Sequence, residues 1–201
     1  MDDCPVDHPR YLVYMCNLGN VHHWCYLYGV QDAADHLQQS LKFLETAERA
    51  SSVSEFRPEI LSTLSTTLSS LYESTGDEKC LDKSLEFQRE SIRLSKDDPI
   101  SLLHLGGFLR LNYRQTQNSK VLEEAIKVLS RALELSKDSP RTQQSAFREL
   151  CGIYYNLFAR MHESRQIQMA IKYGRDGLQL SANSRNSAKL LDSLSSIQRK
   201  V

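Results

Sequence analysis

Residues 105–136, LGGFLRLNYRQTQNSKVLEEAIKVLSRALELS, decide the fold of this 201-residue chain. The first part of this stretch, with the residues just before it, carries large apolar residues on one stripe of a 3.6-residue helix, at Leu102, Leu105, Leu109 and Tyr113. The second part has Ala125 and Ala132 two turns apart on one face, where small side chains let a neighbouring helix approach closely. Polar residues at 115–119 separate the two parts. The stretch therefore predicts a hairpin of two amphipathic helices.

The same spacing recurs three more times along the chain. Each copy contains a leucine anchor followed by a small residue, at Leu18 and Gly19, Leu64 and Ser65, Leu105 and Gly106, and Leu150 and Cys151. An aromatic residue stands eight positions after every anchor. Each copy then continues with two small residues seven apart, namely Ser40 and Ala47, Ser84 and Ser91, Ala125 and Ala132, and Ala170 and Gly177. Recurrence of a whole hairpin pattern predicts a helical repeat array.

This pattern resembles the tetratricopeptide repeat (TPR) family, whose usual period is 34 residues. The anchors here lie 46, 41 and 45 residues apart, and about one additional turn in each helix accounts for most of the longer period. The chain looks like long-helix arrays of fungal multi-repeat proteins, in which units such as LGxxLxxRYxxTGxxxDLEEAI often precede a caspase-like or nucleotide-binding domain. The matching residues are Leu105, Gly106, Leu109, Tyr113, Thr116 and 122–126.

The resemblance implies an all-α fold, a right-handed superhelical array of antiparallel hairpins. We expect one domain over residues 1–201, with repeats at about 10–52, 56–96, 98–137 and 140–182. Residues 184–200 predict one further helix, because Leu190, Leu194 and Ile197 share an apolar stripe. That helix is either a cap on the last hairpin or the start of a fifth repeat.

Composition narrows the function classes. Lys plus Arg and Asp plus Glu both number 25, so the balance of charge does not favour nucleic acid or an anionic membrane. Five cysteines without paired spacing predict free thiols in a reducing compartment, and we expect a cytoplasmic protein. The first ten residues, MDDCPVDHPR, do not resemble a signal peptide. No apolar run approaches the roughly 20 residues of a membrane span.

Candidate catalytic and metal-binding groups have simpler structural explanations. The HHWC cluster at 22–25 brings two ligand types close together, but structural zinc sites use four ligands and no second pair follows. Cys151 occupies a packing position beside an anchor, so we interpret it as a buried thiol and not a nucleophile. We interpret Gly106 and Gly107 as close helix packing. The sequence thus predicts no catalytic residue, no metal ion and no cofactor.

The family resemblance also implies where a ligand would bind. In TPR arrays the first helices line the concave side, and polar residues just beside the apolar stripe face the ligand. Carried over to this chain, these positions are Asn20, His23, Trp24, Thr66, Ser69, Arg110, Arg148, Tyr155 and Asn156. Asparagine and arginine could clamp a peptide backbone or carboxylate. The alternative for each of these positions is an ordinary residue of the helix surface. Trp24, the only tryptophan, is an aromatic anchor for a partner, such a surface residue or a core residue.

These observations favour a noncatalytic scaffold that binds a peptide or protein segment in a concave groove. A second hypothesis is a regulatory array separated from a larger effector of the caspase-like or nucleotide-binding type. A third, a small helical enzyme, would need a pocket with convergent polar groups and a perturbed titratable residue, for which the sequence has no signal.

Overall fold

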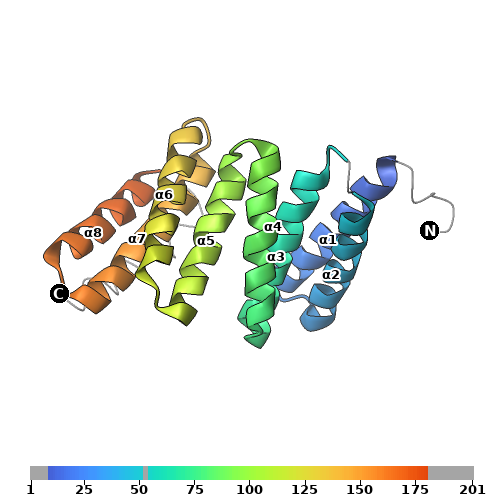
Figure 1. Cartoon of the computed structure of the whole chain (residues 1–201), viewed down its shortest axis with the longest axis horizontal. Helices are drawn as coiled ribbons and strands as arrows, with labels where there is room; N and C mark the ends of the chain where they lie inside the picture. The colour runs from blue at the N-terminus through green and yellow to red at the C-terminus, as the bar shows by residue number, and fades with distance from the viewer. Residues whose placement is uncertain (1–8, 52–53, 181–201) are drawn as a thin grey trace. The chain divides into compact units, whose positions relative to one another are not determined.

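A computed structural model describes residues 9–51 and 54–180, and within these ranges the chain forms eight helices and no strand. The helices are α1 (Pro9–Leu27), α2 (Ala33–Ala50), α3 (Arg57–Thr75), α4 (Glu78–Ser95), α5 (Pro99–Thr116), α6 (Ser119–Leu135), α7 (Pro140–Met161) and α8 (Ser164–Gln179). They form four antiparallel hairpins (Figure 1). The predicted all-α repeat of helical hairpins is confirmed. The predicted helix over 184–200 lies outside the described residues.

The hairpins belong to two compact units, Met1–Asp97 and Asp98–Val201. In the first unit α1 pairs with α2 and α3 with α4, while α2 and α1 also pack against α3. The second unit repeats this arrangement, because α5 pairs with α6 and α7 with α8, and both α6 and α5 pack against α7. In each unit, therefore, both helices of the first hairpin pack against the first helix of the second hairpin.

Capping residues begin and end several of the helices. Gly76 adopts a left-handed conformation at φ 74°, which an achiral residue tolerates, and its N–H donates to the carbonyl of Tyr72. Asp77 then caps α4 by accepting a hydrogen bond from the N–H of Lys79 at 3.1 Å. Asp98 caps α5 through the N–H of Ser101 at 2.7 Å. These local bonds stop one helix and start the next within a few residues.

The paired small residues face inward, as the spacing predicts. All eight are buried, at Ser40, Ala47, Ser84, Ser91, Ala125, Ala132, Ala170 and Gly177. The small residue after each anchor also allows close contact between the two helices of a hairpin. A Cβ added at Gly106 would lie 2.5 Å from Cδ2 of Leu129, and one added at Gly19 would lie 2.5 Å from Cγ of Leu44. In the second hairpin Ser65 instead donates a hydrogen bond to the Gln88 side chain. In these three hairpins the small residue thus accommodates a larger one on the partner helix.

Gly107 departs from the prediction that both adjacent glycines serve close packing. A Cβ at Gly107 would meet no atom within 4 Å, whereas Gly106 contacts Leu129 directly. The two residues point about 100° apart on α5, so only one of them faces α6. Close packing therefore explains Gly106 alone.

The core of the first unit runs through all four of its helices. Its buried members come from both hairpins, at Leu12, Cys16, Leu44, Ala47, Ile60, Leu64, Leu68 and Cys80. In the second unit a cluster of Cys151, Ile167 and Ala170 joins α7 to α8, with Tyr154, Tyr155 and Tyr173 packed around it. Burial of these faces stabilises each hairpin far more than helix propensity does, which explains why the serine-rich segment 62–70 is helical.

Candidate functional site

The nine predicted binding residues all lie on the leading helices of their hairpins. They are Asn20, His23 and Trp24 in α1, Thr66 and Ser69 in α3, Arg110 in α5, and Arg148, Tyr155 and Asn156 in α7. The two compact units divide them into a group of five and a group of four.

In the first unit, most of the predicted residues already have partners inside the protein. His23 is buried, and its Nε2 shares a hydrogen bond with Oγ of Ser70 at 2.9 Å, which joins α1 to α3. Asn20 donates from Nδ2 to Sγ of Cys16 at 3.8 Å, and Thr66 donates to the carbonyl of Thr63. Ser69 is buried. These side chains therefore contribute to packing and local bonding.

Trp24 is the exception in this unit. Its side chain is 61% exposed, which excludes the interpretation of Trp24 as a core residue. A largely exposed tryptophan is unusual on a protein surface, and tryptophan is one of the residues that dominate interfaces. The exposure of Trp24 is compatible with an aromatic anchor for a partner and with an ordinary residue of the helix surface.

In the second unit, both predicted arginines bind one carboxylate. Arg110 donates from Nε to Oε2 of Glu149 at 2.7 Å, and Arg148 donates from Nη2 to Oε1 at 3.1 Å. Burial raises the pKa of Glu149, but the two guanidinium groups outweigh burial and leave its pKa below the usual range. Glu149 therefore stays ionised at neutral pH. The sequence contained no signal for it, since its role depends on a residue 39 positions away.

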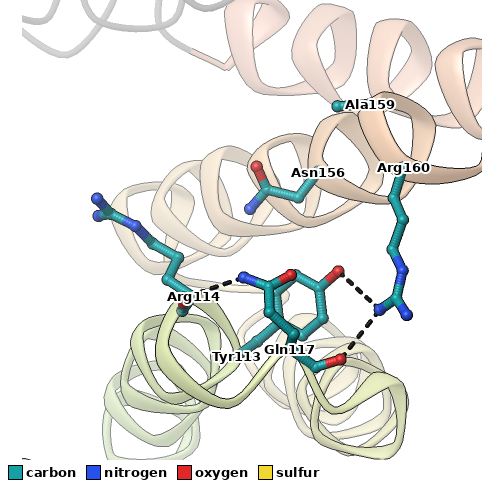
Figure 2. Close-up of a pocket in the computed structure, with 6 residues that line it drawn as sticks. All are labelled: Tyr113, Arg114, Gln117, Asn156, Ala159 and Arg160. Atoms are coloured by element: carbon teal, nitrogen blue, oxygen red, sulfur yellow. Dashed lines mark hydrogen bonds between the residues drawn. The ribbon is translucent and has the colours of Figure 1, made fainter.

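An open pocket of about 340 Å³ lies between α5 and α7. Six residues line it: Tyr113, Arg114, Gln117, Asn156, Ala159 and Arg160 (Figure 2). Only Asn156 among them was a predicted binding residue, while Tyr113 was predicted for the apolar stripe. The other four lie at or just beyond the C-terminal ends of the two helices. The family resemblance predicts binding residues only close to the leucine anchors, so it did not include these four.

Arg160 fixes one wall of this pocket. Its Nη1 donates to the carbonyl of Gln117 at 3.0 Å and to the hydroxyl of Tyr113 at 3.4 Å. Gln117 ends α5 in a left-handed conformation at φ 56°, and its side chain donates to the carbonyl of Arg114 at 3.0 Å (Figure 2). The end of α5 is thus tied both to itself and to α7, so the pocket is held open by bonds already present in the free protein.

Two side-chain groups at the pocket have no partner among the described residues. The carboxamide of Asn156 and the guanidinium of Arg114 make no hydrogen bond or ion pair there (Figure 2). The carboxamide offers both donors and an acceptor, and the guanidinium offers five donors. The lining residues include two arginines and no carboxylate. This arrangement suits a peptide group together with a neighbouring anion.

The metal and nucleophile candidates gain no support from their surroundings. Nδ1 of His22 shares a hydrogen bond with Nδ1 of His36 at 2.9 Å, and no group of three or more potential metal ligands occurs within 9–51 and 54–180. Cys151 is 1% exposed, and burial raises the pKa of its thiol to about 11. A thiol with that pKa is protonated at neutral pH and is a poor nucleophile.

A lipid bilayer could not be crossed by any helix in the described ranges, because none combines sufficient length with sufficiently apolar composition.

Comparison with known proteins supplies no family assignment. No family model and no curated relative matches the sequence. Among solved structures, the designed helical repeat protein DHR64 is 13% identical and aligns over 93% of this chain and 97% of its own, with a TM-score of 0.37. The DHF58 filament is 15% identical over 93% and 98% of the two chains, with a TM-score of 0.44. These likenesses are too distant to carry any functional argument.

Proposed function

We propose that this chain is a noncatalytic binding module of the TPR type, whose second unit holds a peptide or protein segment in the pocket between α5 and α7. One observation carries the proposal: Asn156 and Arg114, whose side-chain polar groups are unpaired, both line an open pocket that Arg160 already holds in shape. A polar group without an internal partner can bond a ligand without first breaking a bond in the protein.

The chemistry of the lining defines the segment that would bind. The Asn156 carboxamide can pair with a peptide group of an extended chain, because it both donates and accepts. Arg114 and Arg160 favour a nearby acidic side chain or terminal carboxylate, since charge-assisted bonds from guanidinium are strong and directional. A volume of about 340 Å³ is near the lower end for ligand pockets. The pocket therefore accommodates one or two side chains of a longer acidic segment.

The thiols support a reducing compartment for this binding. Cys16, Cys25, Cys80 and Cys151 are all free, and free thiols at several positions are usual in a reducing compartment. The free thiols therefore support the cytoplasm as the place of the proposed binding.

The experiment compares binding of short fluorescein-labelled peptides of acidic, neutral and basic composition by fluorescence anisotropy. We expect the full chain to bind the acidic set best, and more weakly at high salt. Asn156→Ala and Arg114→Ala should each weaken binding by about tenfold, because one charge-assisted or buried hydrogen bond contributes roughly 1.5 kcal/mol.

Arg165→Ala is the matched control for charge. Arg165 lies exposed on α8 in the same unit but does not line the pocket. This variant should bind the acidic peptides as the unmodified chain does. Equal losses in Arg114→Ala and Arg165→Ala, with no loss in Asn156→Ala, would show that binding follows net charge and not the pocket. Failure to bind any peptide set would remove the proposed function.

A further inference from the structure

The first helix carries an exposed apolar stripe that the proposed function does not use. Tyr14, Val21 and Trp24 are 55%, 55% and 61% exposed, and Tyr28, directly after α1, is 79% exposed. Spacings of seven, three and four place these side chains on one face of the helix, together with Asn17. We call these five residues the α1 stripe.

The residues at the corresponding positions of α3 are buried by helix packing. Counted from the leucine anchors, Tyr14, Val21 and Trp24 correspond to Ile60, Thr67 and Ser70, which are all buried. The preceding hairpin covers them. Ile60 packs in a core cluster with Leu12 and Leu44, Oγ1 of Thr67 shares a hydrogen bond with Ser40 at 3.2 Å, and Ser70 bonds His23.

In the second unit, the corresponding positions of α7 are also mostly buried. The matching residues in α7 are Ala146, Ile153 and Asn156, of which the first two are fully buried. Arg160, the counterpart of Tyr28, contacts the end of α5. This face of a leading helix is therefore the one that packs against another helix. In α1 the face is apolar, and no helix among the described residues covers it.

The best match for the α1 stripe is the α1 stripe of a second copy of this chain. Eleven large apolar side chains are exposed in the described part of the chain, and six of them lie between residues 14 and 30. The others are single residues on separate segments, at Leu94, Ile100, Leu135, Met161 and Leu180. A second copy thus offers one apolar surface of matching size within these ranges, its own α1 stripe. The stripe contains no charged residue, so two stripes can meet without like charges facing each other.

We propose that two copies of this chain form a symmetric dimer through the α1 stripe, with the two α1 helices antiparallel. Symmetric pairs are the commonest oligomers, and a two-fold axis near the middle of the stripe places the same patch on both partners. Val21 then lies near the axis, and Tyr14 lies opposite Tyr28 of the partner subunit. Burying three aromatic side chains and one valine at these exposures removes roughly 400–500 Å² per partner from water. That is less than the approximately 800 Å² of a standard interface, so we expect the dimer to be weak.

The test uses the full chain and its single tryptophan. Sedimentation velocity from about 1 μM to about 1 mM should show a monomer–dimer equilibrium in the range of weak association. The fluorescence of Trp24, the only tryptophan in the chain, should shift to shorter wavelength over the same concentrations, because the indole leaves water.

Variants separate the stripe from other surfaces. Val21→Glu places two carboxylates close to the axis and should abolish dimerisation, while circular dichroism should show a folded protein because Val21 is mostly exposed. Met161→Glu introduces the same charge at a residue of α7 that is 49% exposed and should dimerise normally. Tyr28→Lys, beyond the end of α1, provides a second disruption if Val21→Glu does not fold.

Three results would overturn the proposal. The chain could remain monomeric at the highest concentration, or both stripe variants could still dimerise. Growth beyond a dimer as concentration rises would indicate head-to-tail stacking of hairpins, since an unclosed heterologous contact propagates. Arg114→Ala, in the second unit, should leave dimerisation unchanged, so this test is independent of the peptide pocket.

Discussion

Arg110 of α5 binds Glu149 of α7 at 2.7 Å, and the carboxylate it binds is only 8% exposed. Arg148 completes the arrangement from the other side at 3.1 Å. Two cations around one buried anion leave a net positive charge on this face of the second unit. The Arg110–Glu149 pair therefore ties α5 to α7.

Glu149→Gln should lower the free energy of unfolding by about 1–3 kcal/mol, because the neutral amide loses the charge-assisted bonds to two guanidinium groups. Urea denaturation measures the loss. Glu134→Gln is the control, since Glu134 makes an exposed ion pair with Arg131 that contributes little. Because the folded-state pKa of Glu149 is lowered, its stabilisation is present at neutral pH and is lost as pH falls through that pKa. The unmodified chain and the Glu149→Gln variant should therefore become equally stable in acid.

The histidine pair in the first unit should make stability depend on pH near neutrality. Burial lowers the pKa of His22, and the charge of His36 lowers it further. The unfolded chain then binds a proton more readily than the folded one, so stability is full above the ordinary pKa of about 6.5 and decreases as pH falls below it.

Unfolding measured between about pH 7.5 and pH 5 should show this decrease. The double variant His22→Gln with His36→Gln should reduce the pH dependence, leaving the contribution of His23, whose pKa burial also lowers. His162→Gln is the matched control, because His162 ends α7 in the same left-handed conformation in which Gln117 ends α5. An unchanged pH profile in the double variant would contradict the prediction.

The adjacent glycines of α5 should respond oppositely to alanine. Gly106→Ala forces a Cβ to within 2.5 Å of the fully buried Leu129 and should destabilise the protein by about 1–3 kcal/mol. Gly107→Ala meets no atom within 4 Å and should stabilise it by about 0.5–1 kcal/mol through helix propensity. Thermal melting of both variants tests this prediction, which fails if the two shifts have the same sign.

Thiol reactivity should differ sharply between two cysteines. Cys151 is almost completely buried with a pKa of about 11, whereas Cys25 is partly exposed. Alkylation of the native protein at neutral pH, followed by peptide mass spectrometry, should modify Cys25 first and leave Cys151 unmodified until the protein unfolds. Prompt native labelling of Cys151 would mean that the contact between α7 and α8 opens readily.

The sequence by itself determined the helices and the way each hairpin closes. Apolar periodicity, the capping aspartates Asp77 and Asp98, and the left-handed Gly76 act within a few residues of chain, so their effect is visible in the letters. The fit of Gly106 against α6 was also predictable, because the repeat places small residues at the same position four times. Asn156, which the family resemblance predicts as a binding position, lines the pocket, and its role in binding stays a prediction.

Only the tertiary structure decided which polar side chains meet. Periodicity shows which face of a helix is buried, but the stagger between two packed helices determines whether Arg110 reaches Glu149 or Arg160 reaches Gln117. A shift of one helical turn, about 5.4 Å, would break either contact without changing the apolar pattern. The exposure of Trp24 has the same cause. Its register is the one covered in α3, and whether another helix covers it depends on the surrounding packing, which the spacing of residues within α1 does not encode.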